Sequence, residues 1–312
     1  MKWIVVFLLF SSFVFTQEEE PYFQLKTSWE LCEVRNVSKV AIRKIFLDDV
    51  LAQESTASSD YKLTVVDTIL RTTIQFEQAY TPLKSEQLNE IPSQELMQFM
   101  VENIELRMQC LPYQLIIDRS SGMAFEITNT TIYDESIEGV ISQSMEDFKP
   151  LMQQSPEGLT EFKDQLATYL KGSKKNILEM VINQLNELLE PYSYSYPLNG
   201  TIEKEVVIDR IGTEKEGVGK VVPATLKLDA RKSQETLNVS TSLTYDKEAF
   251  LEYMKRSNPA FVNVKSGDLN VKEKKEFSAN METKWVEKYT SEMLTEIPGI
   301  RIIQFNSYYF ND

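Results

Sequence analysis

Alternating apolar and polar side chains run through the first and last thirds of the chain. In the last third, Leu237, Val239 and Thr241 share one parity, and Asn238 and Ser240 share the other. A period of two residues is typical of a strand with one buried and one solvated face. The pattern predicts strands over residues 23–31, 39–50, 61–76, 104–117, 123–130, 224–231, 237–245, 277–285 and 300–310, with a polar loop at 53–60 and a hairpin link at 118–122.

The period changes to that of a helix in the middle of the chain. Ile177, Val181 and Leu185 recur at helical spacing, and Pro156 suits the first turn of a helix. We expect a helical block over 134–190, interrupted at Gly172. Short helices are predicted at 93–100 and after Asp246, whose side chain can cap a helix.

These elements predict an α+β fold with a curved, mainly antiparallel, half-barrel-like sheet. Each strand leaves one apolar face that must be covered, and the helical block is the available cover. We expect a single domain over 17–312, with strands at 21–130, the helical block at 134–190 and further strands at 200–310.

The amino-terminal residues have the pattern of an export signal. Met1 and Lys2 precede an uncharged apolar run over 3–15, and glutamates follow at 18–20. A basic start and a short apolar core are typical of a cleavable signal peptide. An uncleaved membrane anchor is the alternative, but a span needs about 20 apolar residues. We therefore expect residues 1–16 to be removed and the protein to be secreted or lumenal, with no membrane span.

Charge and modification motifs agree with that route. The chain carries 33 basic and 47 acidic residues, a formal net charge of −14, which repels phosphate backbones and makes nucleic acid an unexpected partner. Four Asn-x-Ser/Thr motifs, at Asn36, Asn129, Asn199 and Asn238, predict a glycoprotein.

The chain has two cysteines, Cys32 and Cys110. In an oxidising compartment such a pair most often forms one disulfide, which we expect here. Two free thiols are the alternative.

The sequence contains no histidine. Triads with an imidazole base and His-ligated zinc are therefore excluded, and two cysteines are too few for a zinc cluster. Carboxylate-pair chemistry, as in glycoside hydrolysis, needs only Asp and Glu and stays open. We predict no catalytic residue, no metal site and no cofactor.

The order of strands, helices and strands behind a signal peptide resembles the half-barrels of bacterial lipoprotein carriers and related periplasmic or secreted domains. The resemblance lies in the architecture and covers most of the chain. In those proteins the curved sheet and its helices enclose a site for acyl chains. It implies a non-catalytic binding protein for a hydrophobic molecule or a protein partner. The alternatives are a lumenal hydrolase that uses two carboxylates, or a purely structural secreted component.

Overall fold

The computed structural model describes residues 22–25, 29–69, 71–81, 96–149, 156–197, 199–209, 221–257 and 261–311. The expected signal peptide lies outside these ranges. In the part of the chain that the structure describes, no helix is long and apolar enough to cross a membrane.

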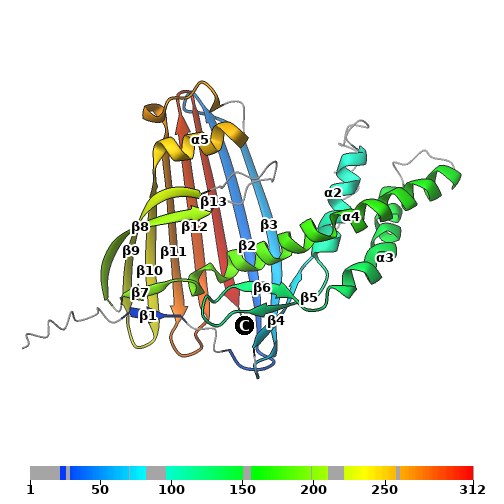
Figure 1. The fold of residues 1–312 in the computed structure, drawn as a ribbon, viewed down its shortest axis with the longest axis horizontal. Helices are drawn as coiled ribbons and strands as arrows, with labels where there is room; N and C mark the ends of the chain where they lie inside the picture. Colours follow the sequence, from blue (N-terminus) through cyan, green and yellow to red (C-terminus); the bar gives the residue numbers. More distant parts are fainter. Residues whose placement is uncertain are drawn as a thin grey trace, which may run out of the picture.

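One antiparallel sheet of 11 strands forms the body of the molecule (Figure 1). Its order is β6-β5-β4-β3-β2-β13-β12-β11-β10-β9-β8, so β6 and β8 are its outer strands and the sheet is open. This confirms the predicted α+β class with a curved antiparallel sheet. The strands are β2 (Val34–Leu47), β3 (Val50–Asp67), β4 (Thr72–Gln78), β5 (Tyr113–Ile117), β6 (Ala124–Ile127), β8 (Asn199–Asp209), β9 (Val221–Lys232), β10 (Thr236–Tyr245), β11 (Asn270–Asn280), β12 (Val286–Ile297) and β13 (Ile300–Asn311).

Two short strands and several helices complete the described structure. Strands β1 (Tyr22–Gln24) and β7 (Ser195–Pro197) pair in a separate small sheet. The helices are α2 (Leu96–Gln109), α3 (Thr131–Phe148), α4 (Pro156–Leu189) and α5 (Lys247–Ser257), with 3-10 turns at Glu190–Tyr192 and Ser266–Asp268. The predicted cap of α5 is present, because the Ala249 amide donates to Asp246 Oδ1 at 2.8 Å.

The predicted loop at 53–60 is wrong, because β3 continues through it. Asp48 and Asp49 have φ of 47° and 63°, as a two-residue hairpin turn of type I′ requires, so the chain turns there. The residues after the turn then pair with β2, as in Gln53 with Ile45. They are small, polar and almost all exposed, so no alternation of buried side chains could have identified them as a strand.

The predicted interruption at Gly172 is also wrong, since α4 runs unbroken from Pro156 to Leu189. Ile177, Val181 and Leu185 form its buried stripe, each with 0% exposure. Burial of such side chains stabilises the fold by about 1.5–3 kcal/mol each. This outweighs the cost of about 0.5–1 kcal/mol for one helical glycine.

Other predicted strand boundaries also differ from those of the structure. The strand predicted at 104–117 begins only at Tyr113, because residues up to Gln109 belong to α2 and bury Ile104 and Met108 on a helical face. Of the strand predicted at 23–31, residues up to Gln24 belong to β1, residues 26–28 lie outside the described ranges and residues 29–31 are not in a strand. The strand predicted at 277–285 ends at Asn280 in a tight turn.

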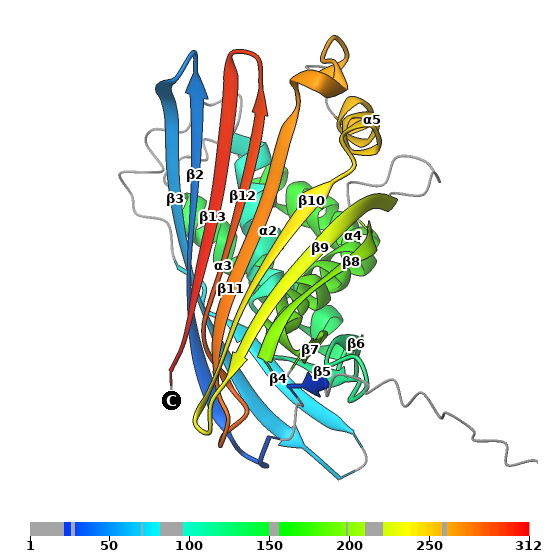
Figure 2. The ribbon, with the colours of Figure 1, turned by 90° about the vertical axis from the view of Figure 1, so that its left-hand side faces the viewer.

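The helices lie on one face of the sheet, which we call the concave face (Figure 2). Helices α2, α3 and α4 pack with β3, β4, β5 and β13 around a large apolar core. Helix α5 covers a second, smaller core on β9, β10 and β11, which includes Leu226, Leu243 and Phe250. The central helical block therefore covers only part of the concave face, and α5 covers another part.

Candidate functional site

The register of the central strands places one row of side chains from β2, β13 and β12 on the concave face, and we call this strip of the sheet the trough. Asn306 and Gln304 of β13 lie on the α4 side of the sheet, because they line a cavity with Glu187 of α4. Every second residue shares that face. The trough is therefore formed by Ala41, Arg43 and Ile45 on β2, Asn306, Gln304, Ile302 and Ile300 on β13, and Ser291, Met293 and Thr295 on β12.

A charged cluster fixes the end of α4 to the floor of the trough. Glu190 accepts hydrogen bonds from Lys275 Nζ and, at 2.6 Å, from the Tyr289 hydroxyl. Lys275 also pairs with Glu273 at 2.9 Å. Burial alone would lower the pKa of Lys275, but Glu190 and Glu273 outweigh it and raise that pKa above its ordinary value. The ammonium group therefore stays charged beneath the helix.

A second contact of the same kind lies one turn earlier in α4. Glu187 accepts a hydrogen bond from Lys39 Nζ at 2.9 Å and another from the Tyr308 hydroxyl. The Tyr308 ring stacks on Tyr289 with 5.1 Å between ring centroids. Burial, followed by the charge of Glu187, raises the pKa of Tyr308 well above its ordinary value, so the phenol remains a donor.

These contacts surround a polar cavity of about 220 Å³ between α4 and the sheet. Glu187, Glu190 and Glu273 each accept from a lysine and a tyrosine in this cluster. A general acid must instead hold a proton that it can give to a leaving group. All three carboxylates are engaged as acceptors across the contact between α4 and the sheet, and this arrangement suits the anchoring of α4 better than acid catalysis.

The trough becomes apolar away from α4. Ile45 pairs with Ile302 and Leu47 pairs with Ile300, so four aliphatic side chains follow Arg43 and Gln304 toward the hairpin tips. Ile45, Ile302 and Ile300 are half-buried, and Leu47 is 49% exposed. Met293 and Ile297 join this strip to the core under α5. A polar half and an apolar half thus lie end to end on one surface.

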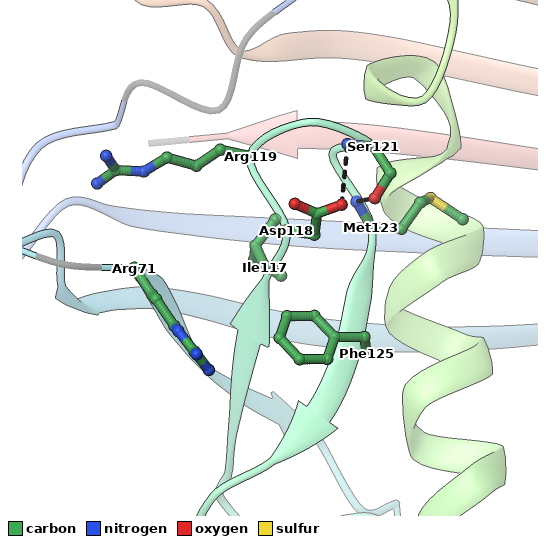
Figure 3. A pocket seen from close by; sticks show the side chains of 7 residues that line it. All are labelled: Arg71, Ile117, Asp118, Arg119, Ser121, Met123 and Phe125. Atoms are coloured by element: carbon green, nitrogen blue, oxygen red, sulfur yellow. Dashed lines mark hydrogen bonds between the residues drawn. The ribbon is translucent and has the colours of Figure 1, made fainter.

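A second pocket, of about 480 Å³, lies at the β5–β6 hairpin (Figure 3). The Arg71 guanidinium lies 6.0 Å from the centre of the Phe125 ring, and Arg119 donates to the Thr68 carbonyl at 2.7 Å. Asp118 accepts from Ser120 and Ser121, which lowers its pKa to about 2 and keeps it ionised. The charged groups of the lining are two cations, Arg71 and Arg119, and one anion, Asp118, whose carboxylate already accepts from the neighbouring serines.

The expected disulfide is not formed, and Cys32 and Cys110 are free. The Cys32 amide donates to the Val65 carbonyl. The Cys110 thiol instead lies near the Tyr61 phenol, where it adds to the rise that burial causes in the pKa of Tyr61. Val65 and Tyr61 are separated by about 13 Å along β3, at roughly 3.3 Å per residue. A disulfide requires Cα atoms within about 7 Å. Sequence separation carries no information on this distance.

The expected glycosylation sites lie in different surroundings. Asn36 and Asn238 are exposed on β2 and β10. Asn129 is half-buried, its Nδ2 donating to the Pro112 carbonyl at 3.0 Å and its Oδ1 accepting from the Gln114 amide at 2.7 Å. Asn199 begins β8, and its side chain is outside the described residues.

The residues of the trough were not identified from the sequence. One signal was present: Lys275 and Glu273 occupy the same parity of β11 as buried Phe277 and Val271. Charged residues at buried strand positions indicate a buried polar cluster. Their partner Glu190, in the turn after α4, could not be recognised without the fold.

No protein family and no curated protein matches the chain. Among solved structures, it resembles a structure of lipovitellin that describes lipid–protein interactions, with a TM-score of 0.43 and 9% sequence identity. The match covers 91% of this chain and 25% of the lipovitellin chain, so the chain spans about a quarter of that protein. This is a distant likeness of architecture, and it carries no argument about function.

Proposed function

We propose that this protein is a secreted or lumenal, non-catalytic binding protein whose trough holds an elongated amphipathic molecule of the lipid class. The observation that carries the proposal is the change from polar to aliphatic side chains along one face of β2 and β13. A protein partner remains the alternative occupant. Export and glycosylation, which the sequence predicts, belong to the same proposal.

The polar half of the trough would bind the head group. Arg43 supplies a cation, and Gln304 and Asn306 supply amide donors and acceptors beside it. The adjoining cavity of about 220 Å³ adds room for a polar group. A zwitterionic head group matches these side chains, with its anionic part at Arg43 and its cationic part toward the glutamates that line the cavity.

The apolar half would hold the hydrocarbon chain. Ile45, Ile302 and Ile300 still expose part of their surface, and each square ångström of apolar surface removed from water stabilises a complex by about 25 cal/mol. From Asn306 to Ile300 the strand extends about 20 Å at roughly 3.3 Å per residue. This length suits an extended ligand.

The proposal is tested by exchanging one isoleucine on each face of β13. Ile302→Glu places a carboxylate in the apolar half of the trough, and Ile303→Glu places one on the opposite face of the same strand. Both positions are half-buried, so their effects on folding are comparable. We expect Ile302→Glu to weaken binding of a fluorescent fatty acid or phospholipid roughly tenfold or more, because a buried unpaired charge costs over 1.4 kcal/mol.

Native mass spectrometry and lipid extraction of the purified wild-type protein complete the test. A co-purifying amphipathic molecule, depleted in Ile302→Glu and retained in Ile303→Glu, supports the proposal. Equal binding by both variants, or the absence of lipid binding by the wild type, contradicts it. In the second case a purely structural role becomes the better account.

A further inference from the structure

A shallow hollow of about 790 Å³ lies on the face of the sheet opposite the helices, which we call the convex face. Asn238 and Ser240 flank buried Val239 on β10, and Glu276 and Ser278 flank buried Phe277 on β11, so these four residues face away from the core. Val239 and Phe277 themselves also line the hollow, and β9, β12 and β13 contribute Asp229, Arg231, Lys288, Thr290 and Phe305.

The chemistry of the lining suits a carbohydrate. Hydroxyl groups of Ser240, Ser278 and Thr290 can both donate and accept, as sugar hydroxyls do. Arg231 and Lys288 add donors, and the half-buried Phe305 ring supplies a flat apolar surface for the C–H face of a sugar ring. The volume is within the range of about 300–1,000 Å³ found for small-ligand sites.

The hollow also contains an attachment point. Asn238 lines it, is exposed, and begins the motif Asn238-Val239-Ser240. Asn36 is exposed on the same convex face, since it alternates with buried Val37, but it does not line the hollow. Asn238 is thus the one acceptor, among those whose side chains the structure describes, that stands inside a polar hollow.

We propose that an N-linked glycan on Asn238 folds back into this hollow and packs against the sheet. Covalent attachment makes the contact intramolecular, so weak hydrogen bonds suffice to hold it. The seated sugar would cover Phe305 and its cross-strand neighbour Ile42, which are half-buried on a face without a covering helix in the described structure. The glycan then acts as a built-in cover that prevents association through this apolar surface.

The test measures how fast a glycosidase releases each glycan from the native protein made in glycosylating eukaryotic cells. Variants Asn36→Gln and Asn238→Gln, with site-resolved mass spectrometry, assign each glycan. A glycan that is seated about 90% of the time should be released about tenfold more slowly than a free one. We expect such protection at Asn238, in comparison with Asn36 and with the denatured chain.

Phe305→Ala and Lys288→Ala should speed release at Asn238 and leave Asn36 unchanged. Equal release rates at Asn238 in native and denatured protein overturn the proposal, as does an unmodified Asn238. Lipid binding in the trough is on the other face, so its success or failure does not affect these outcomes.

Discussion

The Cys110 thiol lies partly buried after α2, and this burial raises its pKa to about 11. The nearby charge of Arg107 lowers the pKa, but by less than burial raises it. The thiolate is the reactive form. At pH 8 we therefore expect Cys110 to be about one-thousandth ionised and to be alkylated slowly, with a rate that rises as the pH approaches about 11.

Cys32 is the internal control, since it is exposed in the turn before β2. Alkylation of the native protein, followed by peptide mass spectrometry, should show one fast and one slow thiol without added reductant. If neither cysteine reacts until a reductant is present, the two are bridged and the free-thiol geometry is wrong.

Gly122 is held where a side chain does not fit. Its φ is +70°, and a Cβ there would lie 2.6 Å from the Tyr192 carbonyl oxygen. Gly122→Ala should therefore lower the free energy of unfolding by about 1–3 kcal/mol. Gly172 is the matched control, because nothing lies within 4 Å of its Cβ position. Gly172→Ala should raise the free energy of unfolding by about 0.5–1 kcal/mol.

Urea denaturation of both alanine variants measures these changes. The two changes in the free energy of unfolding should have opposite signs, because only Gly122 is required by its surroundings. If Gly122→Ala leaves the free energy of unfolding unchanged, the β5–β6 hairpin does not pack against the turn after α4.

At the scale of elements, β3 has two parts with different neighbours. Residues 61–64 lie between β2 and β4, and 65–67 continue the pairing with β4, whereas 50–60 are in register with β2 alone among the described residues. Amides in 50–60 should therefore exchange hydrogen faster than those in 61–67. Hydrogen exchange with mass spectrometry measures this, and β2, paired on both sides, is the slow reference. Equal protection along β3 would reveal a further partner at this edge.

The sequence predicts elements best where one face is apolar. The stripe of α4, the alternation in β10 and the Ile, Phe and Tyr content of β13 indicated their structure correctly. The polar half of β3 and the second half of α2 were missed, because exposed small residues carry no periodicity and Ile104 to Met108 fit either period over so short a range. In each case tertiary packing decided what local pattern left open.

At the scale of the whole molecule, the curved antiparallel sheet followed from one-sided strands, but the trough did not. Its floor combines Arg43 and Gln304, which are brought together only by the pairing of β2 with β13, and Glu190 reaches the adjoining cavity only through the turn after α4. Pairing between distant strands depends on their register, and the sequence of one strand alone does not determine that register. The absence of histidine and the net charge, in contrast, follow from composition alone.

The position of β13 has a consequence for biosynthesis. This strand spans residues 300–311, yet it inserts between β2 and β12 at the middle of the sheet. While the ribosome is still making it, the earlier strands have an unfilled slot at their centre, with β2 presenting bare backbone amides. The sheet therefore cannot form strand by strand in chain order, and until β13 has been made its centre remains open to capture by chaperones or by another unfinished copy.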